Sequence, residues 1–500
     1  MDGRKTSAQT QAEHNPMTKE TTIGLCKNRL TFFMLQSHYS LIILCASKGS
    51  MPTKKQKKLF RDPVHNVIHF DLSDPTERML FELIDTPPVQ RLRHVRQLGL
   101  ACFIYPGAEH TRFGHALGTQ HVANRLFEAA APGGDLFERT VVRAAALLHD
   151  VGHAAFSHAF ETGLSAIAPF HHERMTCMCI LEPGGDIFRI LSAFDPRLPQ
   201  AVVDCIAHER HAWYHTIVSG QLDADRMDYI LRDGYMTGIK SYRYDMDRII
   251  EMLDFDALGL IVSHRAIPAV ENYLISRYHM YQQVYHHKTV RGAEKLLESL
   301  FRRLADLVLG GNREILGVER LGRLLGDVID KRRVDPDLCL AVHDAHAWSA
   351  LDAWRDAEDP ILAHLSQSLI SRQYFKTVEV PNEACTLLRR QWSEFEAIVH
   401  RLGFDPRYYL YLDTTQNTAF APYGPEPAPL LPFPGITSNP STTRHDDIRI
   451  LLSSGKVVSI QEASPIVDML TRAPRHIARL CFPEAARACI LEHLRGMRVL

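Results

Sequence analysis

Hydrophobic residues recur at intervals of three and four along most of the chain after residue 60, which is the period of an amphipathic α-helix. A helix is also predicted from His115, because His115, Thr119, Val122 and Leu126 follow one another at helical spacing on one face. Proline at 87 and 88 ends the first helix, because proline removes a backbone donor and clashes with the preceding turn. Besides the helix from His115, the spacing predicts helices over 76–84, 89–98, 138–148, 173–182, 199–209, 223–233, 245–253, 271–309 and 384–402.

Two stretches favour strands. Residues 258–263 followed by 265–270 predict a small hairpin, and the alternation over 448–458, with helices after 464, predicts a small C-terminal module. The predicted fold class is therefore all-α, mainly helical, with small β-hairpin elements and a minor α+β C-terminal module. The predicted organisation is a main domain over 51–310, a helical extension over 311–421, a proline-rich linker over 422–440 and the module over 441–500.

The first fifty residues require a separate interpretation. Leu30–Ala46 is apolar but is broken by polar residues at 36–40, and its length is at the short end of what spans a bilayer. A signal peptide normally begins closer to the terminus. We interpret 1–50 as an N-terminal extension with no role in the fold, with a weak membrane anchor as the alternative.

Composition narrows the class of protein. The chain has 57 Lys+Arg against 58 Asp+Glu, and 45% of its residues are hydrophobic, which excludes wholesale disorder. A net charge of −1 gives no general attraction to nucleic acid or membrane, and neither is expected as a partner. The ten cysteines contain no CxxC pair, which favours buried thiols in a reducing, cytoplasmic compartment. Histidine is the unusual residue, since eleven of the 27 fall between His110 and His215.

The segment AAALLHDVGHAAFSH at 144–158 concentrates the candidate chemistry. His149 and Asp150 are adjacent, and His153 follows one helical turn after His149. Imidazole beside carboxylate suits a divalent transition metal, and further ligands are needed for a tight site. Each piece alone is weak, because an HD dipeptide is common by chance. Its occurrence with an upstream Gly-His115 and the downstream motif DADRMDYILRD at 223–233 is much harder to attribute to chance.

Taken together, these motifs resemble the HD-domain metal-dependent phosphohydrolases. Within that superfamily they are most similar to the deoxynucleoside triphosphate triphosphohydrolases, which include the SAM- and HD-domain enzymes of animals and bacterial relatives. The resemblance runs from about residue 58 to 291. Its motifs are DPVHNVI at 62–68, IDTPPVQRLRHVRQLG at 84–99, YPGAEHTRFGHALG at 105–118, HDxGHxxFSH at 149–158, DxDRxDYxxRD at 223–233 and RYHMYQQVYHHK at 277–288.

The resemblance implies a metal centre and an acid–base group. It makes the metal ligands His115, His149, Asp150 and Asp225. The ion would be Mn, Fe, Zn, Co, Ni or Mg, acting as a Lewis acid on the α-phosphorus and orienting the attacking water. Proton transfer would fall to His158 or His172, oriented by Glu161 or Glu173, and His153 would add a catalytic or phosphate contact.

Substrate contacts follow from the same resemblance. Arg112, Arg226 and Arg277 would bind the triphosphate, although Arg226 stands where the animal enzymes carry lysine, so the γ-phosphate contact is in doubt. The deoxyribose would meet four further residues. These are Gln97, Tyr229, Asp233 and Tyr285. Arg277, Tyr281, Tyr285 and Lys288 would form one helical stripe, with an ordinary amphipathic helix as the alternative.

A regulatory site and partners are also implied. Asp85, Gln90 and Arg93 align with residues that bind an activating guanine nucleotide, which would make the chain an allosteric homo-oligomer, a dimer or tetramer. The alternative is that Asp85 is a turn residue and Arg93 a surface charge. The small-molecule partner is a nucleotide substrate.

Three functions remain open from the sequence. The first is hydrolysis of deoxynucleoside triphosphates to deoxynucleoside and inorganic triphosphate. The second keeps the metal site but acts as a phosphatase or phosphodiesterase on another nucleotide, because a fold does not fix its substrate. The third is a nucleotide-binding regulatory protein without turnover.

Overall fold

The computed structural model describes residues 57–165, 167, 170–207, 212–317, 319–330, 335–417, 447–472 and 475–500. The predictions for 1–50 and for the linker at 422–440 fall outside the described residues. Lys54–Leu500 form one compact unit. Within the described part, no helix is long and apolar enough to cross a membrane.

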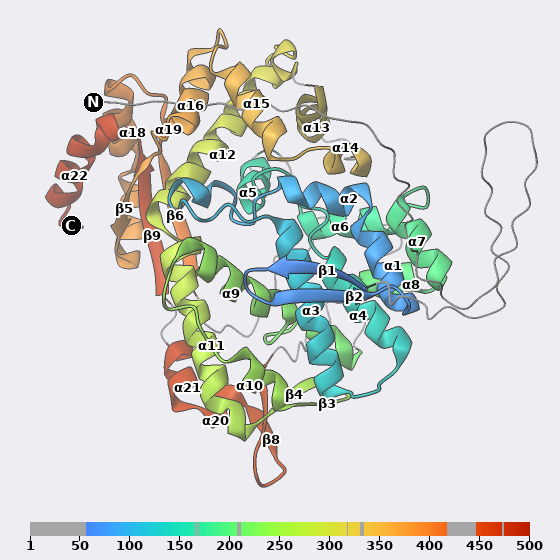
Figure 1. Cartoon of the computed structure of the whole chain (residues 1–500). Helices are drawn as coiled ribbons and strands as arrows, with labels where there is room; N and C mark the ends of the chain where they lie inside the picture. The colour runs from blue at the N-terminus through green and yellow to red at the C-terminus, as the bar shows by residue number, and fades with distance from the viewer. Residues whose placement is uncertain are drawn as a thin grey trace, which may run out of the picture. The chain divides into compact units, whose positions relative to one another are not determined.

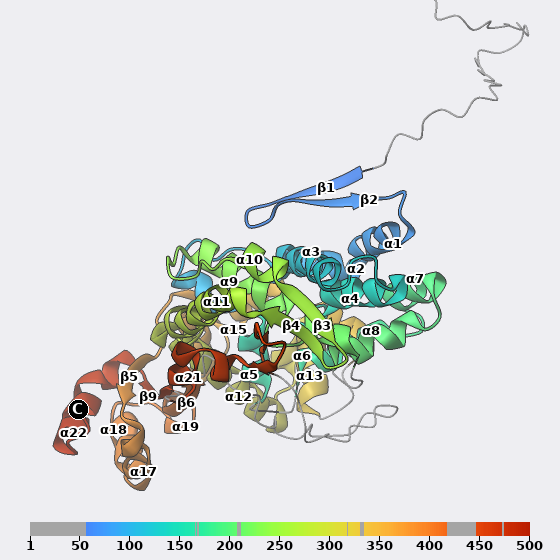
Figure 2. The ribbon, with the colours of Figure 1, turned by 90° about the horizontal axis from the view of Figure 1, so that it is seen from below.

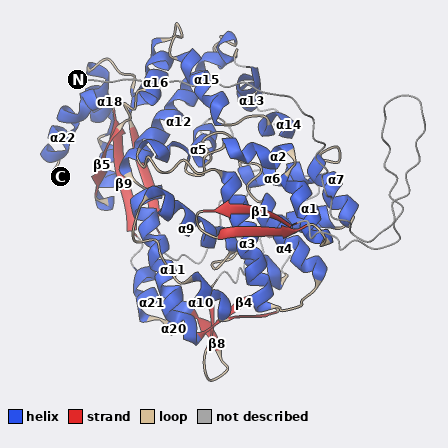
Figure 3. Ribbon diagram, viewed as in Figure 1, coloured by secondary structure: helices blue, strands red, loops and turns tan. Residues whose placement is uncertain are grey.

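Helices make up most of the structure, which confirms the predicted fold class (Figures 1 and 3). The helices of the first part are α1 Pro75–Ile84, α2 Pro87–Arg91, α3 Arg112–Ala130, α4 Leu136–Leu148, α5 His158–Ser165, α6 His172–Leu181, α7 Asp186–Phe194, α8 Leu198–Ile206, α9 Ala224–Thr237, α10 Met246–Glu251, α11 Ile267–Met280 and α12 Lys288–Leu309. The later helices are α13 Glu319–Ile329, α14 Pro336–Leu340, α15 Asp344–Trp354, α16 Pro360–Ile370, α17 Cys385–Arg390, α18 Trp392–Arg401, α19 Pro406–Tyr409, α20 Ile460–Ala463, α21 Pro465–Arg472 and α22 Arg487–Gly496.

Three small sheets lie among these helices. The first pairs β1 Lys57–Asp62 with β2 Asn66–Asp71. The second has the order β3-β4-β7-β8, and the third has the order β5-β9-β6. Their strands are β3 Leu253–Asp256, β4 Gly259–Ser263, β7 Arg449–Leu451, β8 Val457–Ser459, β5 Lys376–Val380, β9 Arg475–Phe482 and β6 Tyr411–Asn417.

The residues after the proline-rich segment complete sheets that begin earlier in the chain. Strand β7 pairs in parallel with β4, and β9 lies between β5 and β6 with antiparallel pairing on both sides. These strands therefore share sheets with residues of the predicted main domain and helical extension. The predicted domain boundaries themselves stay a prediction.

Several predicted elements have different bounds in the structure. The hairpin pairs β3 with β4, whereas 265–270 starts a helix, because Ser263 caps a short turn and Pro268 occupies the first turn of α11. The single helix predicted over 271–309 is interrupted by a π-helical segment at Tyr281–Tyr285. The helix predicted over 384–402 breaks at Gln391, and the β1–β2 hairpin was not anticipated.

The core is divided between two hydrophobic clusters. The first surrounds the packed helices α3, α4, α8 and α9, and it includes the fully buried Val122, Leu126 and Leu147. The second surrounds α12, which crosses α5 and α16, and includes Leu300 and Phe301. In Figure 2 the β1–β2 hairpin lies beyond α3 on the outer side of the first cluster. The segment from His149 to His158 connects α4 of the first cluster to α5 of the second.

Candidate active site

Four candidate metal ligands converge from three helices; we call His115, His149, Asp150 and Asp225 the metal cluster. His115 lies in the first turn of α3, His149 caps the C-terminus of α4, and Asp150 follows it directly. Asp225 lies in the first turn of α9, whose start is fixed by the Asp223 side chain accepting a hydrogen bond from the Arg226 backbone N–H at 2.7 Å. The first turns of α3 and α9 and the C-terminus of α4 therefore bring together residues up to about 110 positions apart.

The ring nitrogens of the two histidines point at the same carboxylates. His115 Nε2 is 2.9 Å from Asp225 Oδ1 and 3.7 Å from Asp150 Oδ2. His149 Nε2 is 3.5 Å from Asp225 Oδ1 and 3.4 Å from Asp150 Oδ1. Ligand atoms of His115, His149 and Asp225 all lie within 4.8 Å of one another, and Asp150 stands beside this set with one oxygen accepting from Arg112.

The opposite ring nitrogens are held by the protein. His149 Nδ1 is 2.9 Å from the Ala146 carbonyl oxygen, and His115 Nδ1 is 2.8 Å from Asp228 Oδ2. An N–H at Nδ1 leaves the Nε2 lone pair free for a metal. Within the described residues, His149 Nε2 is buried and makes no hydrogen bond. This donor set of two imidazoles and two carboxylates fits a divalent ion.

A buried ion-pair network backs His115. Asp228 is fully buried, and it accepts from Arg232 Nε at 2.8 Å and contacts His65 Nε2 at 2.6 Å. Arg232 also donates to Asp62 at 2.7 Å. A Cβ at Gly118 would collide with the Asp228 carboxylate, so glycine allows α3 to approach α9 closely. Sequence reasoning left Asp228 without a role, although its place three residues after Asp225 put it on the same helix.

The charges of the metal cluster are strongly coupled. Burial alone would raise the pKa of Asp150, but Arg112, His149 and His153 hold it well below its usual value. Burial would lower the pKa of His115, but hydrogen bonds to Asp225 and Asp228 raise it to about 10. In the metal-free protein the imidazoles are therefore protonated and paired with the carboxylates, and a bound cation would take the place of the protons on Nε2.

Within the metal cluster, Asp225 is the member most open to solvent. The side chains of His115 and Asp150 are 1% and 5% exposed, whereas that of Asp225 is 33% exposed. A ligand can therefore approach the cluster from the side of Asp225 and His149.

A second group lies next to the metal cluster; we call His153, His158, Glu161 and His172 the imidazole cluster. Their ligand atoms also lie within 4.8 Å of one another. Glu161 Oε2 is 2.9 Å from His172 Nδ1 and 3.4 Å from His158 Nδ1. Of the two glutamates expected to orient these rings, Glu161 contacts both, whereas Glu173 is half exposed and lies 4.0 Å from His171.

The members of the imidazole cluster differ in burial and charge. His153 is 1% exposed and stacks on His172 with ring centroids 3.8 Å apart. Burial, Arg112 and His172 hold the pKa of His153 well below its usual value, so its ring is neutral. Burial would raise the pKa of Glu161, but hydrogen bonds with His158 and His172 lower it. His158, with its side chain 66% exposed, is the member most open to solvent.

The loop that joins the two clusters is conformationally strained. Phe156 and Ser157 both have positive φ, 57° and 55°, in the left-handed region that side chains disfavour. The Phe156 N–H donates to Asp344 at 2.9 Å, and Ser157 Oγ accepts from Arg112 Nε at 2.8 Å. Gly152 is required here, because a Cβ would collide with the backbone of α6.

The three arginines expected to bind phosphate are buried near the clusters and have protein partners. Arg112 bonds to Asp150 and Ser157, and Arg226 bonds to Asp223 and the Gly220 carbonyl. Arg277 Nη1 donates to Gln221 Oε1 at 2.9 Å, while its Nε has no partner among the described residues. Gln221 is a contact that no sequence signal indicated.

The residues expected at the sugar lie near His115. The Tyr229 ring is 6.5 Å from the His115 ring and 5.9 Å from the Tyr285 ring, measured between centroids. Tyr285 donates to Asp233 at 2.8 Å, and His110 Nε2 lies 2.7 Å from the other Asp233 oxygen. His110 is a further contact that sequence reasoning left without a role.

Gln97 and Tyr281 complete this region. Gln97 is 9% exposed, and its Oε1 has no hydrogen-bond partner in the described part of the chain, while its N–H donates to the His110 carbonyl at 3.0 Å. Tyr281 lies 5.1 Å from Tyr285, and the Arg277 guanidinium is 5.7 Å from the Tyr281 ring. The stripe ends there, because Lys288 begins α12 after the π-helical segment.

The residues expected to bind an activating nucleotide lie at one edge of the α1–α2 region. Arg93 Nε donates to Gln90 Oε1 at 2.8 Å, and Gln90 Nε2 donates to the Ile84 carbonyl at 2.8 Å. Asp85 is the C-cap of α1, and the Arg93 guanidinium lies 3.5 Å from the centroid of the Phe113 ring. The three residues therefore lie close together, between the end of α1 and the turn that follows α2. Their regulatory role stays a prediction.

Comparison with known proteins identifies the superfamily. The model of the HD domain matches residues 112–233, and that of an HD-associated region matches 244–315. An uncharacterized protein of Bacillus subtilis, YwfO, is 32% identical over 438 residues, which cover 86% of this chain and 93% of that protein. This chain is an HD-domain phosphohydrolase. The matched HD domain spans all members of both clusters.

Two further likenesses are informative. The deoxynucleoside triphosphate triphosphohydrolase SAMHD1 homolog of Dictyostelium discoideum is 28% identical over 271 residues, half of each chain. A solved phosphohydrolase from Bacteroides thetaiotaomicron has a TM-score of 0.67 and 27% identity, covering 86% of this chain and all of that one. This chain is thus similar to known phosphohydrolases in both sequence and fold.

Proposed function

We propose that this HD phosphohydrolase hydrolyses deoxynucleoside triphosphates to deoxynucleoside and inorganic triphosphate. The observation that carries the proposal is the group formed by Tyr229, Tyr285 and Asp233 beside His115. It offers two aromatic rings and a carboxylate next to the metal cluster. A flat aromatic surface packs against a 2′-CH₂ but excludes a hydroxyl, and Asp233 can accept a hydrogen bond from a 3′-hydroxyl. The related triphosphohydrolases support the same substrate class.

The metal cluster would supply the electrophilic part of the reaction. His115, His149, Asp150 and Asp225 would hold the ion. When bound there, a divalent ion polarises the α-phosphate and lowers the pKa of water. Asp228 and the Ala146 carbonyl hold the two rings with Nε2 toward Asp225, where the ion would lie. The partial exposure of Asp225 gives the α-phosphate its approach.

The imidazole cluster would handle the proton. Water attacks the α-phosphorus and gives up one proton, the bond from phosphorus to O5′ breaks, and O5′ takes up one proton. His158 is the exposed donor for it, and Glu161 holds His158 and His172 in place. His153, neutral and lacking a hydrogen-bond partner in the described structure, can donate an N–H to a phosphate oxygen.

The cations would neutralise the triphosphate. Arg277 lies beside Tyr281 with a free Nε among the described residues, and Arg112 stands at Asp150. Burial would raise the pKa of Tyr281, but Arg277 and Arg226 lower it, which indicates a positive potential in this part of the site. A polyanion is stabilised by such a potential.

The test is a product analysis with matched variants. The protein is incubated with Mn²⁺ and each deoxynucleoside triphosphate, alone and with dGTP or GTP, and the products are separated by ion-exchange chromatography. We expect deoxynucleoside and intact triphosphate, no turnover with Asp225→Ala, and full turnover with Asp356→Ala, whose carboxylate is 81% exposed. Release of orthophosphate or pyrophosphate instead would exclude the proposal.

The sugar contact has its own test. Tyr285→Ala removes the ring that faces Tyr229, so we expect the preference for dATP over ATP to fall by about tenfold or more. Tyr285→Phe keeps the ring and loses only the bond to Asp233. An unchanged preference in Tyr285→Ala would remove Tyr285 from the sugar site.

One observation favours a smaller phosphate ester as the runner-up substrate. Arg226, expected at the γ-phosphate, is bonded to Asp223 and to the Gly220 carbonyl. A nucleoside monophosphate would not need that cation. Turnover of a monophosphate, with no turnover of any triphosphate, would establish this alternative in the same assay.

A further inference from the structure

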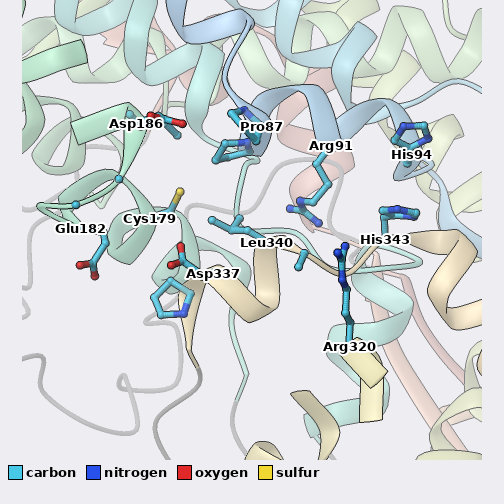
Figure 4. A pocket seen from close by; sticks show the side chains of 16 residues that line it. Pro87, Arg91, His94, Cys179, Glu182, Asp186, Arg320, Asp337, Leu340 and His343 are labelled. Carbon is cyan, nitrogen blue, oxygen red and sulfur yellow. The ribbon is translucent and has the colours of Figure 1, made fainter. Parts of the chain in front are cut away.

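A cavity of about 540 Å³ lies apart from both clusters, between α2, the α6–α7 connection and the α13–α14 region (Figure 4). Pro87 and Pro88 of α2 form part of its wall. Among the described residues that line it, none belongs to the metal cluster or the imidazole cluster, and Asp85, Gln90 and Arg93 do not line it either. We call it the α2 cavity.

One end of the α2 cavity is cationic. Figure 4 shows His94, His343 and Arg320 on one side, with Arg91 reaching toward Leu340 in the middle. Arg91 is 6% exposed, its hydrogen bonds go to backbone carbonyls, and the carboxylate of Asp344 attracts it only from beyond hydrogen-bond distance. Its Nε is buried without a hydrogen-bond partner in the described structure. Burying a guanidinium that makes no close ion pair is costly, and an anion beside it would relieve that cost.

The imidazoles report the same potential. Burial, then repulsion from His346, His94, Arg91 and Arg320, lowers the pKa of His343 to about 4. The His94 and His343 rings are 5.1 Å apart between centroids. Two arginines and two further imidazoles therefore act on this one side chain.

The opposite end is acidic. Glu182, Asp186 and Asp337 lie across the cavity from the arginines in Figure 4, and Asp186 is bonded to Arg189. Carboxylates accept hydrogen bonds and repel anions. A ligand that fits both ends carries its negative charge at one end and hydroxyl donors at the other.

Arg91 also links the α2 cavity to the loop of the metal cluster. Its Nη2 donates to the carbonyls of Val151 and His153, both at 2.7 Å, and its Nη1 donates to the Val342 carbonyl at 2.6 Å. Val151 follows Asp150 directly, and Val342 precedes His343 of the cavity wall. One side chain thus fixes the backbone on both sides.

We propose that the α2 cavity binds a small phosphate-bearing molecule, such as a sugar phosphate, and that Arg91 transmits its occupancy to the loop that carries Asp150 and His153. The phosphate occupies the end formed by Arg91, Arg320 and His343, and the hydroxyls face the acidic end. The ligand is not the substrate of the reaction proposed above, because the cavity contains no member of either cluster.

Binding is tested on the full chain freed of metal by a chelator, which separates it from catalysis. Ribose 5-phosphate and inorganic phosphate are titrated by calorimetry. We expect both to bind, the ester more tightly, and Arg320→Gln to weaken both by about tenfold through loss of one charge-assisted contact. Arg323→Gln, another exposed arginine of α13 outside the cavity, should bind as the wild type does. Absence of binding, or equal binding by Arg320→Gln, overturns the proposal.

Transmission is tested through metal affinity rather than activity. We expect saturating ribose 5-phosphate to change the Mn²⁺ dissociation constant of the wild type by about fivefold. Arg320→Gln should show no change at the same ligand concentration. Arg91→Lys keeps the charge but loses the forked bonds to Val151 and His153, so it should bind ligand without the change in Mn²⁺ affinity. If Arg91→Lys does not fold, Arg320→Gln decides; an unchanged constant in the wild type overturns the transmission.

Discussion

The metal cluster and the imidazole cluster both combine histidines with carboxylates, and both lie within the HD domain. They differ in how their imidazole rings are held. In the metal cluster each Nδ1 is fixed by a carboxylate or carbonyl, and the free Nε2 atoms face two carboxylates. In the imidazole cluster one carboxylate, Glu161, serves two rings, and a third ring lies stacked on one of them.

The difference indicates two kinds of chemistry. Fixed tautomers with converging lone pairs hold a cation. Stacked rings cannot both direct their in-plane lone pairs at one ion, whereas an exposed histidine held by a carboxylate can exchange a proton with a substrate. Proximity of histidines alone does not define a metal site, since both groups satisfy the same distance limit. Whether the histidines can hold a metal ion depends on how their hydrogen-bond partners orient the rings.

The largest effect should come from the metal cluster itself. Asp225→Ala removes the carboxylate that both Nε2 atoms face, so we expect bound metal to disappear and hydrolysis to fall by at least about 10³-fold. Metal content is measured by mass spectrometry after dialysis, and hydrolysis by product release. Retention of wild-type metal by this variant would contradict the assignment.

The imidazole cluster should behave in the opposite way. Glu161→Gln leaves the metal ligands untouched but weakens the hold on His158 and His172, so we expect full metal content with kcat lower by about 10²-fold. Glu173→Gln is the matched control and should retain wild-type kcat, because Glu173 is half exposed and contacts only His171 at the 4.0 Å limit. Loss of metal in Glu161→Gln would mean that the two clusters form one site.

An intermediate effect is expected from the residue behind His115. Asp228→Asn keeps the shape of the side chain but removes the charge that fixes the His115 tautomer, so Mn²⁺ affinity should fall by about 10–100-fold. Titration with Mn²⁺ measures it, and the melting temperature is recorded in parallel. An unchanged Mn²⁺ affinity in a folded Asp228→Asn variant would show that the bond from Asp228 to His115 does not contribute to metal binding.

The smallest effect concerns a histidine outside both clusters. Burial, with Arg291 and Arg479 nearby, lowers the pKa of His286 to about 4, against about 6.5 in an unfolded chain. Between these values the unfolded chain binds a proton that the folded one does not. The free energy of unfolding should therefore fall as pH drops from about 6.5 to about 4, with His286 contributing about 1–3 kcal/mol.

The measurement is urea unfolding at several pH values in that window. His286→Gln should lose less stability than the wild type as the pH falls, while the exposed His69→Gln should follow the wild type. Equal slopes for all three proteins would show that the pKa of this imidazole is not lowered in the folded chain. His286 thus differs from the rings of both clusters, because burial and nearby arginines, not a hydrogen-bonded carboxylate, set its pKa.

Much of the site could be predicted from local sequence. The HD dipeptide and the i, i+4 and i+8 spacing of Asp225, Tyr229 and Asp233 are properties of single helices, and the structure places those residues on the faces expected. The mainly helical fold follows from the same periodicity. Local spacing also indicated that Arg277, Tyr281 and Tyr285 share one face, and their rings and cation lie in contact.

The rest depends on contacts between distant residues. The partners of Arg277 and Arg91 are a glutamine and three backbone carbonyls, which carry no sequence pattern. The pairing of β4 with β7 joins residues nearly 190 positions apart, so no local alternation could reveal it. The π-helical interruption at Tyr281–Tyr285 arises inside a segment whose hydrophobic spacing is helical throughout.

The order of strands in the third sheet has a consequence for how the chain is made. β9 lies between β5 and β6 but is synthesised after both, so on the ribosome the two earlier strands wait without their shared neighbour. Until β9 emerges, each presents unpaired backbone groups along one edge, which is the condition that invites pairing with another chain. Completion of β9 near the end of translation thus removes two exposed strand edges at once.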